Sequence, residues 1–143
     1  MRVISVDDEP GIDLQPYDKV VIGASIRYGR HRPQVLDFIR RNAGTLERKA
    51  GALFTVNIVA RKPEKSRPDT NPYMKKLLKQ IPWRPQQLEV FAGKLDYPRY
   101  GFLDRNIIRF IMLLTGGPTN PSAVVEYTDW QRVDAFGRKI AAM

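Results

Sequence analysis

An uninterrupted apolar run that ends in glycine constrains the fold more than any other stretch of this chain. Val20, Val21 and Ile22 are β-branched in succession, and Gly23 follows them. Such a run predicts a strand buried on both faces, as in a parallel sheet covered by helices. Residues 24–29 then carry a hydroxyl, an aromatic ring and a guanidinium. Because open α/β sheets bind ligands beyond the carboxyl ends of their strands, this loop is expected to receive a flat ligand. The alternative is an ordinary strand-to-helix turn.

The rest of the chain alternates predicted strands with predicted helices. Strands are predicted at 52–59, 88–92 and 124–127, with a weak one at 3–6. One helix is predicted to begin at Pro33 and to stop near Gly44. Three more are predicted to begin at Pro72, 104 and 130. Their proposed N-caps are, in the same order, Asn71, Asp104, and Thr128 or Asp129. Strands that alternate with helices favour an α/β fold with an open parallel sheet and flanking helices.

The composition of the chain limits the kinds of functional site that it can form. The chain has 143 residues, enough for one globular domain with a core, and no apolar run long enough to span a bilayer. It has no cysteine, which excludes disulfides and thiolate sites, and a single histidine, His31, which argues against a histidine metal cage or a Ser-His-Asp triad. No metal site is therefore expected.

The net charge of +9 and the pI near 10 favour an anionic partner. Nucleic acid, an acidic membrane surface and a small molecule that carries carboxylates or phosphates all fit. Charge alone does not choose among them.

Two loops follow predicted strand ends, at 24–29 and 60–71. If these strands are neighbours, the loops face each other across a slot for a planar heterocycle, on which Tyr28 can stack while Ser25 and Asn57 bind ring nitrogens and carbonyls. Four basic residues would make the mouth of this slot cationic and suited to a substrate that carries carboxylates: Arg27, Arg61, Lys62 and Lys65. Each of them alone could instead be a solvated surface charge. With no persuasive carboxylate pair for acid–base work, cofactor-based redox chemistry fits better than hydrolysis.

A basic amphipathic helix is predicted at 104–114. Arg105 and Arg109 lie one turn apart, and four apolar residues line the other side: Ile107, Ile108, Ile111 and Leu114. The helix is too short to cross a bilayer, but it could lie in the interface with its arginines toward lipid phosphates. The alternative is a helix packed on its own domain.

Four stretches of the sequence carry a family resemblance: residues 17–29 (YDKVVIGASIRYG), 56–65 (VNIVARKPEK), 97–100 (YPRY) and 127–130 (YTDW). They resemble the flavodoxin-like, quinone-dependent protoporphyrinogen IX dehydrogenases of bacteria. The resemblance runs from about Tyr17 to the end of the chain. The first two stretches are specific to that family rather than to flavodoxins at large.

The resemblance implies FMN as cofactor, oxidation of protoporphyrinogen IX to protoporphyrin IX, and electron transfer to a membrane quinone. It implies a single flavodoxin-like domain over 1–143, an insertion at about 94–122 that splits the last strand, and a peripheral location on the cytoplasmic face of the inner membrane. The residues expected to bind the cofactor are Ala24, Ser25, Ile26, Arg27, Tyr28, Gly29, Asn57, Ile58, Val59 and Ala60. Those expected to bind substrate are Arg61, Lys62, Lys65, Tyr97, Arg99 and Tyr100. Those expected to contact an anionic membrane are Arg105, Ile108, Arg109, Ile111 and Met112. No catalytic base is identified.

The chain departs from the family at its start. Flavodoxin-like proteins open with a strand, a phosphate loop rich in hydroxyls and glycines, and a helix, whereas this chain begins near what resembles the second strand. An N-terminally incomplete sheet is therefore expected, with FMN bound weakly or not at all. Residues 3–6 would either pair beside Val20–Gly23 or stay loose.

Other functions remain open on the sequence. The main alternative is a flavodoxin-type electron carrier or a flavin-dependent NAD(P)H:quinone reductase. A nucleic-acid module is suggested by the pI alone, and nucleic acid is not expected as a partner because no recognition motif accompanies that charge. Self-association into a homo-oligomer stays open.

Overall fold

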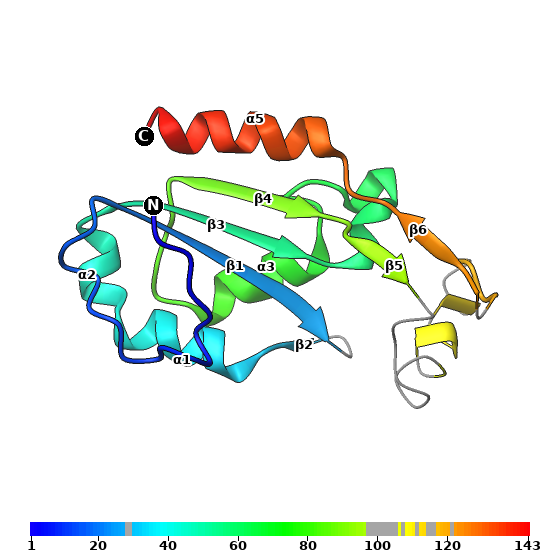
Figure 1. The fold of residues 1–143 in the computed structure, drawn as a ribbon, viewed down its shortest axis with the longest axis horizontal. Helices are drawn as coiled ribbons and strands as arrows, with labels where there is room; N and C mark the ends of the chain where they lie inside the picture. Colours follow the sequence, from blue (N-terminus) through cyan, green and yellow to red (C-terminus); the bar gives the residue numbers. More distant parts are fainter. Residues whose placement is uncertain (28–29, 97–105, 107, 111, 114–116, 121) are drawn as a thin grey trace. The chain divides into compact units, whose positions relative to one another are not determined.

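The computed structural model describes residues 1–27, 30–96, 106, 108–110, 112–113, 117–120 and 122–143. The chain divides into two compact units (Figure 1). The first consists of Met1–Ala92 and Asp129–Met143, and the second of Gly93–Thr128. The predicted insertion at about 94–122 lies within the second unit.

A mixed sheet forms the centre of the first unit. Its strands are β1 (Lys19–Arg27), β3 (Ala50–Val56) and β4 (Gln87–Phe91), all parallel, with the short β2 (Arg30–His31) antiparallel to β1; the order is β2-β1-β3-β4. The arrowheads of β1, β3 and β4 point the same way in Figure 1. The predicted open α/β sheet is confirmed, and the three parallel strands end at one edge.

Helices flank this sheet. They are α1 (Pro33–Arg41), α2 (Ala43–Glu47), α3 (Pro72–Gln80) and α5 (Trp130–Ala141). The predicted caps Asn71 and Asp129 are confirmed, since both side chains accept backbone N–H groups of the first helical turn. Gly44 was predicted as a helix stop, but it lies inside α2, which begins after a break of one residue at Asn42.

The face of the sheet toward α5 has an aromatic core. Phe54, Phe91 and Phe136 meet edge to face, with ring centroids 5.8 to 6.2 Å apart. Gly23 of β1 pairs with Phe54, and a Cβ built at Gly23 would lie 2.4 Å from Cζ of that ring. The ring of Phe54 can therefore lie this close to β1 because Gly23 has no Cβ.

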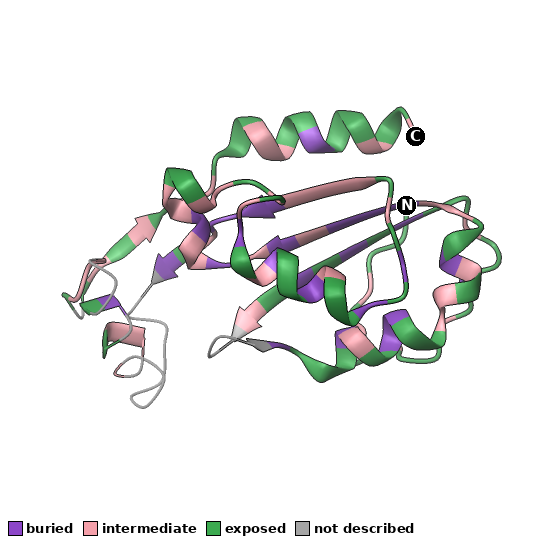
Figure 2. Ribbon diagram, turned by 180° about the vertical axis from the view of Figure 1, so that it is seen from behind, coloured by how far each residue is buried: buried purple, intermediate pink, exposed green. Residues whose placement is uncertain are grey.

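The prediction that β1 is buried on both faces was wrong. Val20, Ile22 and Ala24 are buried, whereas Val21 is 42% exposed. Buried and exposed segments both occur along the strands of this sheet in Figure 2. The aromatic core rests on β3 and β4 and meets β1 at Gly23, against the ring of Phe54, whereas Val21 on the same face of β1 remains partly exposed. Burial therefore alternates along β1 as it does in a strand with one covered face.

Strand boundaries differ from the sequence prediction at both candidate loops. Residues 24–27 continue β1 because Ile26 and Arg27 pair with β2, so the predicted loop at 24–29 is mostly strand. β3 ends at Val56 because Asn57 caps the 3-10 helix η1 (Ile58–Arg61). Residues 3–6 form no strand, so the expected pairing beside Val20–Gly23 is absent; Val3 is exposed, whereas Ile4 and Val6 are half-buried.

The second unit contains β5 (Lys94–Asp96) and β6 (Val124–Glu126), an antiparallel pair. Residues 106, 108–110 and 112–113 are helical, within the helix predicted at 104–114. The proposed cap Asp104 lies outside the described residues. Within the part of the chain that is described, no helix has the length and apolar character needed to cross a membrane.

Candidate functional site

The ends of β1 and β3 meet, as the slot hypothesis requires. Ser25 and Val56 are Cα partners in the parallel pairing, so the segments that follow them start at neighbouring points. Tyr28 and Gly29 lie outside the described residues, as does the side chain of Arg27. The adjacency of the two strand ends is therefore established from the backbone.

The surface at these strand ends combines apolar side chains with a hydroxyl. Ser25 is exposed, while Ile26, Ile58 and Val59 are half-buried. Ala24 and Ala60 are buried and contribute to the underlying core. Ser25 and Ile26 follow one another in β1, so their side chains point to opposite faces of the sheet. Partly exposed apolar side chains suit the face of a flat heterocycle, and a hydroxyl suits its edge.

Asn57 does not offer its side chain to this surface. It is 4% exposed, and its Oδ1 accepts from the N–H of Ala60 at 3.2 Å. Its Nδ2 donates to Thr55 Oγ1 at 3.2 Å and to Asn71 Oδ1 at 3.3 Å. Asn57 was predicted to bind ring nitrogens and carbonyls of the ligand, but its side-chain amide forms its hydrogen bonds inside the protein.

Three of the predicted substrate-binding cations follow directly after the end of β3. Arg61 is the last residue of η1, Lys65 is the last residue of a second 3-10 helix, η2 (Pro63–Lys65), and Lys62 lies between the two helices. All three are half-buried. Arg61 Nη1 donates to the carbonyl of Ile58 at 3.0 Å. These residues give the segment a positive potential. The other three predicted substrate residues, Tyr97, Arg99 and Tyr100, lie outside the described part of the chain.

The residues predicted to contact a membrane belong to the second unit, and those that the structure describes are buried or half-buried. Met112 is fully buried and Ile108 half-buried, and Arg109 Nε donates to the carbonyl of Thr119 at 2.6 Å. Arg105 and Ile111 are outside the described residues. Two residues that the sequence analysis did not select, Phe110 and Leu113, are 61% and 67% exposed. Their i, i+3 spacing, which places them on one helix face, was the available signal.

His31 lies on β2, where it pairs with Ile26 at the end of β1. Its side chain is only 8% exposed, and its Nε2 meets no hydrogen-bond partner among the described residues. Burial, together with the positive charge of Lys76, lowers the pKa of His31 to about 4. The imidazole is therefore neutral at pH 7. Nothing in the sequence around it marked it as buried.

A separate cavity lies between the N-terminal segment and α1. Its volume is about 430 Å³, and its lining mixes charges of both signs: Asp7, Asp37, Arg40 and Arg41. Two of these groups have partners outside the lining: Asp7 pairs with Arg32 at 2.6 Å, and Arg40 donates to the Gln80 carbonyl at 3.2 Å. The cavity is lined by none of the residues at the strand ends. Among the described residues there is also no cluster of three or more histidine or carboxylate groups that could hold a metal.

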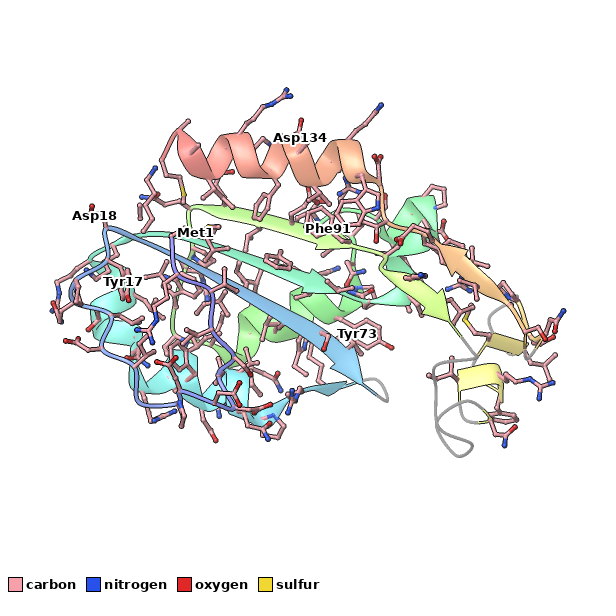
Figure 3. The ribbon with its side chains drawn as sticks, viewed as in Figure 1. Met1, Tyr17, Asp18, Tyr73, Phe91 and Asp134 are labelled. Atoms are coloured by element: carbon pink, nitrogen blue, oxygen red, sulfur yellow. The ribbon has the colours of Figure 1, made fainter. Side chains whose placement is uncertain are left out.

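The side chains drawn in Figure 3 place Tyr73 at the start of α3 and Phe91 at the end of β4. Tyr73 N–H and Met74 N–H are the two donors that Asn71 caps, each at 3.1 Å. The start of α3 is thus linked through Asn71 to Asn57, one residue beyond the end of β3.

Comparisons with known proteins identify the family of this chain. A family model described as "Flavodoxin domain" matches residues 1–122. The chain is 48% identical over 125 residues to protoporphyrinogen IX dehydrogenase (quinone) of Escherichia coli K12, covering 87% of this chain and 69% of that protein. This chain belongs to the quinone-dependent protoporphyrinogen IX dehydrogenase branch of the flavodoxin family.

A second relative extends the match. The chain is 42% identical over 141 residues to the protein of the same name from Leishmania major, covering 99% of this chain and 61% of that protein. No solved structure matches this chain. The family resemblance drawn from the four sequence stretches is confirmed, and a flavodoxin domain implies a flavin cofactor.

Proposed function

We propose that this chain uses FMN to oxidise protoporphyrinogen IX to protoporphyrin IX, with a membrane quinone as the electron acceptor. The observation that carries the proposal is the 48% identity to a protein named for this reaction. The adjoining ends of β1 and β3 supply the matching geometry. A bound flavin would supply the redox chemistry, taking up electrons from the substrate and giving them to the quinone, while the protein would hold and orient the ring.

The residues at the strand ends fit the ring part of the cofactor. Ile26, Ile58 and Val59 offer partly exposed apolar surface, and Ser25 is exposed on the face of β1 opposite to Ile26. In this account they bind and orient a flat ring and exclude water from its face. The cations of the next segment, Lys62 and Lys65, orient a substrate that carries carboxylates.

Phe110 and Leu113 support a peripheral membrane location for the enzyme. Two large apolar side chains exposed on one face of a short helix are suited to the boundary between headgroups and acyl chains. The net charge of +9 adds attraction to an anionic lipid surface. Such a location would bring the enzyme to its quinone.

The enzymatic proposal is tested by anaerobic turnover of the FMN-loaded protein with protoporphyrinogen IX and a soluble quinone. Porphyrin fluorescence is expected to appear only when the quinone is present. Oxidation of NADH or NADPH without any porphyrin product would instead assign a quinone reductase.

The membrane proposal is tested by sedimentation with anionic and neutral vesicles. The protein is expected to sediment with vesicles that contain phosphatidylglycerol, and the Phe110→Ser/Leu113→Ser variant is expected to stay in the supernatant. Equal sedimentation of the two proteins would contradict the assignment of these residues.

A further inference from the structure

We propose that the buried amide pair Asn57–Asn71 is a positioning element that holds residues 58–65 in the conformation that receives the flavin ring. This inference rests on the proposed function, since it assigns two residues a part in forming that site. Neither residue is a catalytic residue, because both side chains are buried beneath the strand ends rather than at their surface.

The two amides bind each other reciprocally. Asn71 Nδ2 donates to Asn57 Oδ1 at 3.0 Å, and Asn57 Nδ2 donates to Asn71 Oδ1 at 3.3 Å. Asn57 is 4% exposed and Asn71 is fully buried. The two residues are fourteen positions apart in the sequence, so the pair closes the loop that runs from the end of β3 to the start of α3.

The remaining hydrogen bonds of the pair reach into that loop. Asn57 Oδ1 accepts from Ala60 N–H, and Asn71 Nδ2 donates to the carbonyl of Lys65 at 2.9 Å. The other N–H of Asn57 donates to Thr55 on β3. Each of the four amide N–H groups therefore has an acceptor, and the loop is tied at Ala60 and at Lys65.

Capping alone does not explain asparagine at position 71. The cap of α3 uses only Oδ1, which accepts from Tyr73 and Met74, and serine or aspartate would serve that purpose. The two N–H groups of Asn71 Nδ2 form hydrogen bonds that capping does not require. They hold Asn57 and the carbonyl of Lys65, and an aspartate at 71 would set an acceptor against both.

Fixing this loop matters for a ligand at the strand ends. The loop carries Ile58 and Val59, whose half-exposed side chains are assigned to the ring, and Lys62, assigned to the substrate. A loop that is already ordered does not lose conformational freedom when the ligand binds. Because the bonds of the pair are complete in the protein alone, the site is preorganised.

The first test measures amide hydrogen exchange without any ligand. Asn71→Asp keeps the cap acceptor but loses both donors, and Asn42→Asp is the matched control. Asn42 Nδ2 donates to the Phe38 carbonyl at 2.9 Å at the end of α1, away from this loop. Exchange at Ala60, Lys62 and Lys65 is expected to accelerate about tenfold or more in Asn71→Asp, while amides of β3 and α1 keep their rates. Unchanged rates at these three amides, or equal acceleration throughout the protein, would overturn the proposal.

The second test measures FMN affinity by amide chemical shifts. Asn71→Asp is expected to weaken FMN binding about tenfold, with Asn42→Asp within about twofold of the unsubstituted chain. If the unsubstituted chain binds FMN and Asn71→Asp binds it equally well, the positioning role is contradicted while the proposed function stands. If the unsubstituted chain shows no FMN-dependent shifts, the proposed function fails for this chain, and the exchange rates alone decide whether the pair orders the loop.

Discussion

Gly23→Ala is the substitution whose effect follows most directly from the structure. The added Cβ would lie 2.4 Å from Cζ of Phe54 and 2.9 Å from each Cε of the same ring. Ordinary carbon contacts are about 3.5–4.0 Å, so the ring must move by about 1 Å. It cannot do so without disturbing its edge-to-face contacts with Phe91 and Phe136, whose centroids lie 5.8 and 6.2 Å away.

The cost can be bounded from these contacts. Overpacking of this kind costs about 1–3 kcal/mol, and replacing glycine returns about 0.4–1 kcal/mol through the unfolded state. We therefore expect Gly23→Ala to lower the free energy of unfolding by about 1–2 kcal/mol, measured by urea denaturation at an unchanged slope. Gly137→Ala is the control, since a Cβ there meets nothing within 4 Å, and it is expected to stabilise α5 by up to about 1 kcal/mol.

A double-mutant cycle decides whether the clash is the cause. Phe54→Leu removes the ring edge that the new methyl group meets, so it is expected to cost less in the Gly23→Ala background than alone, with a coupling of about 1 kcal/mol. Additive effects of the two substitutions, or a Gly23→Ala protein as stable as the unsubstituted chain, would refute this account of the packing.

Three further predictions concern charge and capping. Because the folded-state pKa of His31, about 4, lies below its ordinary value of 6.5, its contribution to stability is complete above pH 6.5 and is lost as the pH falls toward 4. The free energy of unfolding is expected to fall by roughly 3 kcal/mol over this range. His31→Gln should therefore make the free energy of unfolding depend less on pH between 6.5 and 4. An unchanged dependence on pH would show that other groups cause it. Asp129→Ala removes the acceptor of Gln131 N–H and Arg132 N–H and is expected to cost about 1 kcal/mol in urea unfolding, whereas Asp129→Asn should cost much less. Replacing both Lys62 and Lys65 with glutamine is expected to raise KM for protoporphyrinogen IX with little change in kcat, and an equal rise for its neutral dimethyl ester would contradict recognition of carboxylates.

Local patterns in the sequence were sufficient for much of the fold. Val20–Ile22 identified a strand, and Asn71 and Asp129 identified helix starts, because each signal depends on neighbours within a few residues. The parallel sheet was also predicted, but the adjacency of the two strand ends was only a condition of the slot hypothesis, and the pairing of β1 with β3 meets it.

Features that depend on distant contacts did not follow. The exposure of Val21 depends on where α5 packs, and α5 begins more than a hundred residues later. The orientation of Asn57 depends on Asn71, and a single polar residue at the end of an apolar strand carries no sign of such a partner. The pairing of β2 involves only two residues, too few to leave a pattern.

The central claim is that the ends of β1 and β3 together form a flavin site. It is tested most directly by titrating the isotopically labelled chain with FMN and following amide chemical shifts, a measurement that detects weak as well as tight binding. The account predicts that the largest shifts occur at residues 24–27 and 57–65, and that those of α2 and α5 stay small. Shifts concentrated elsewhere, or none at saturating FMN, would contradict it.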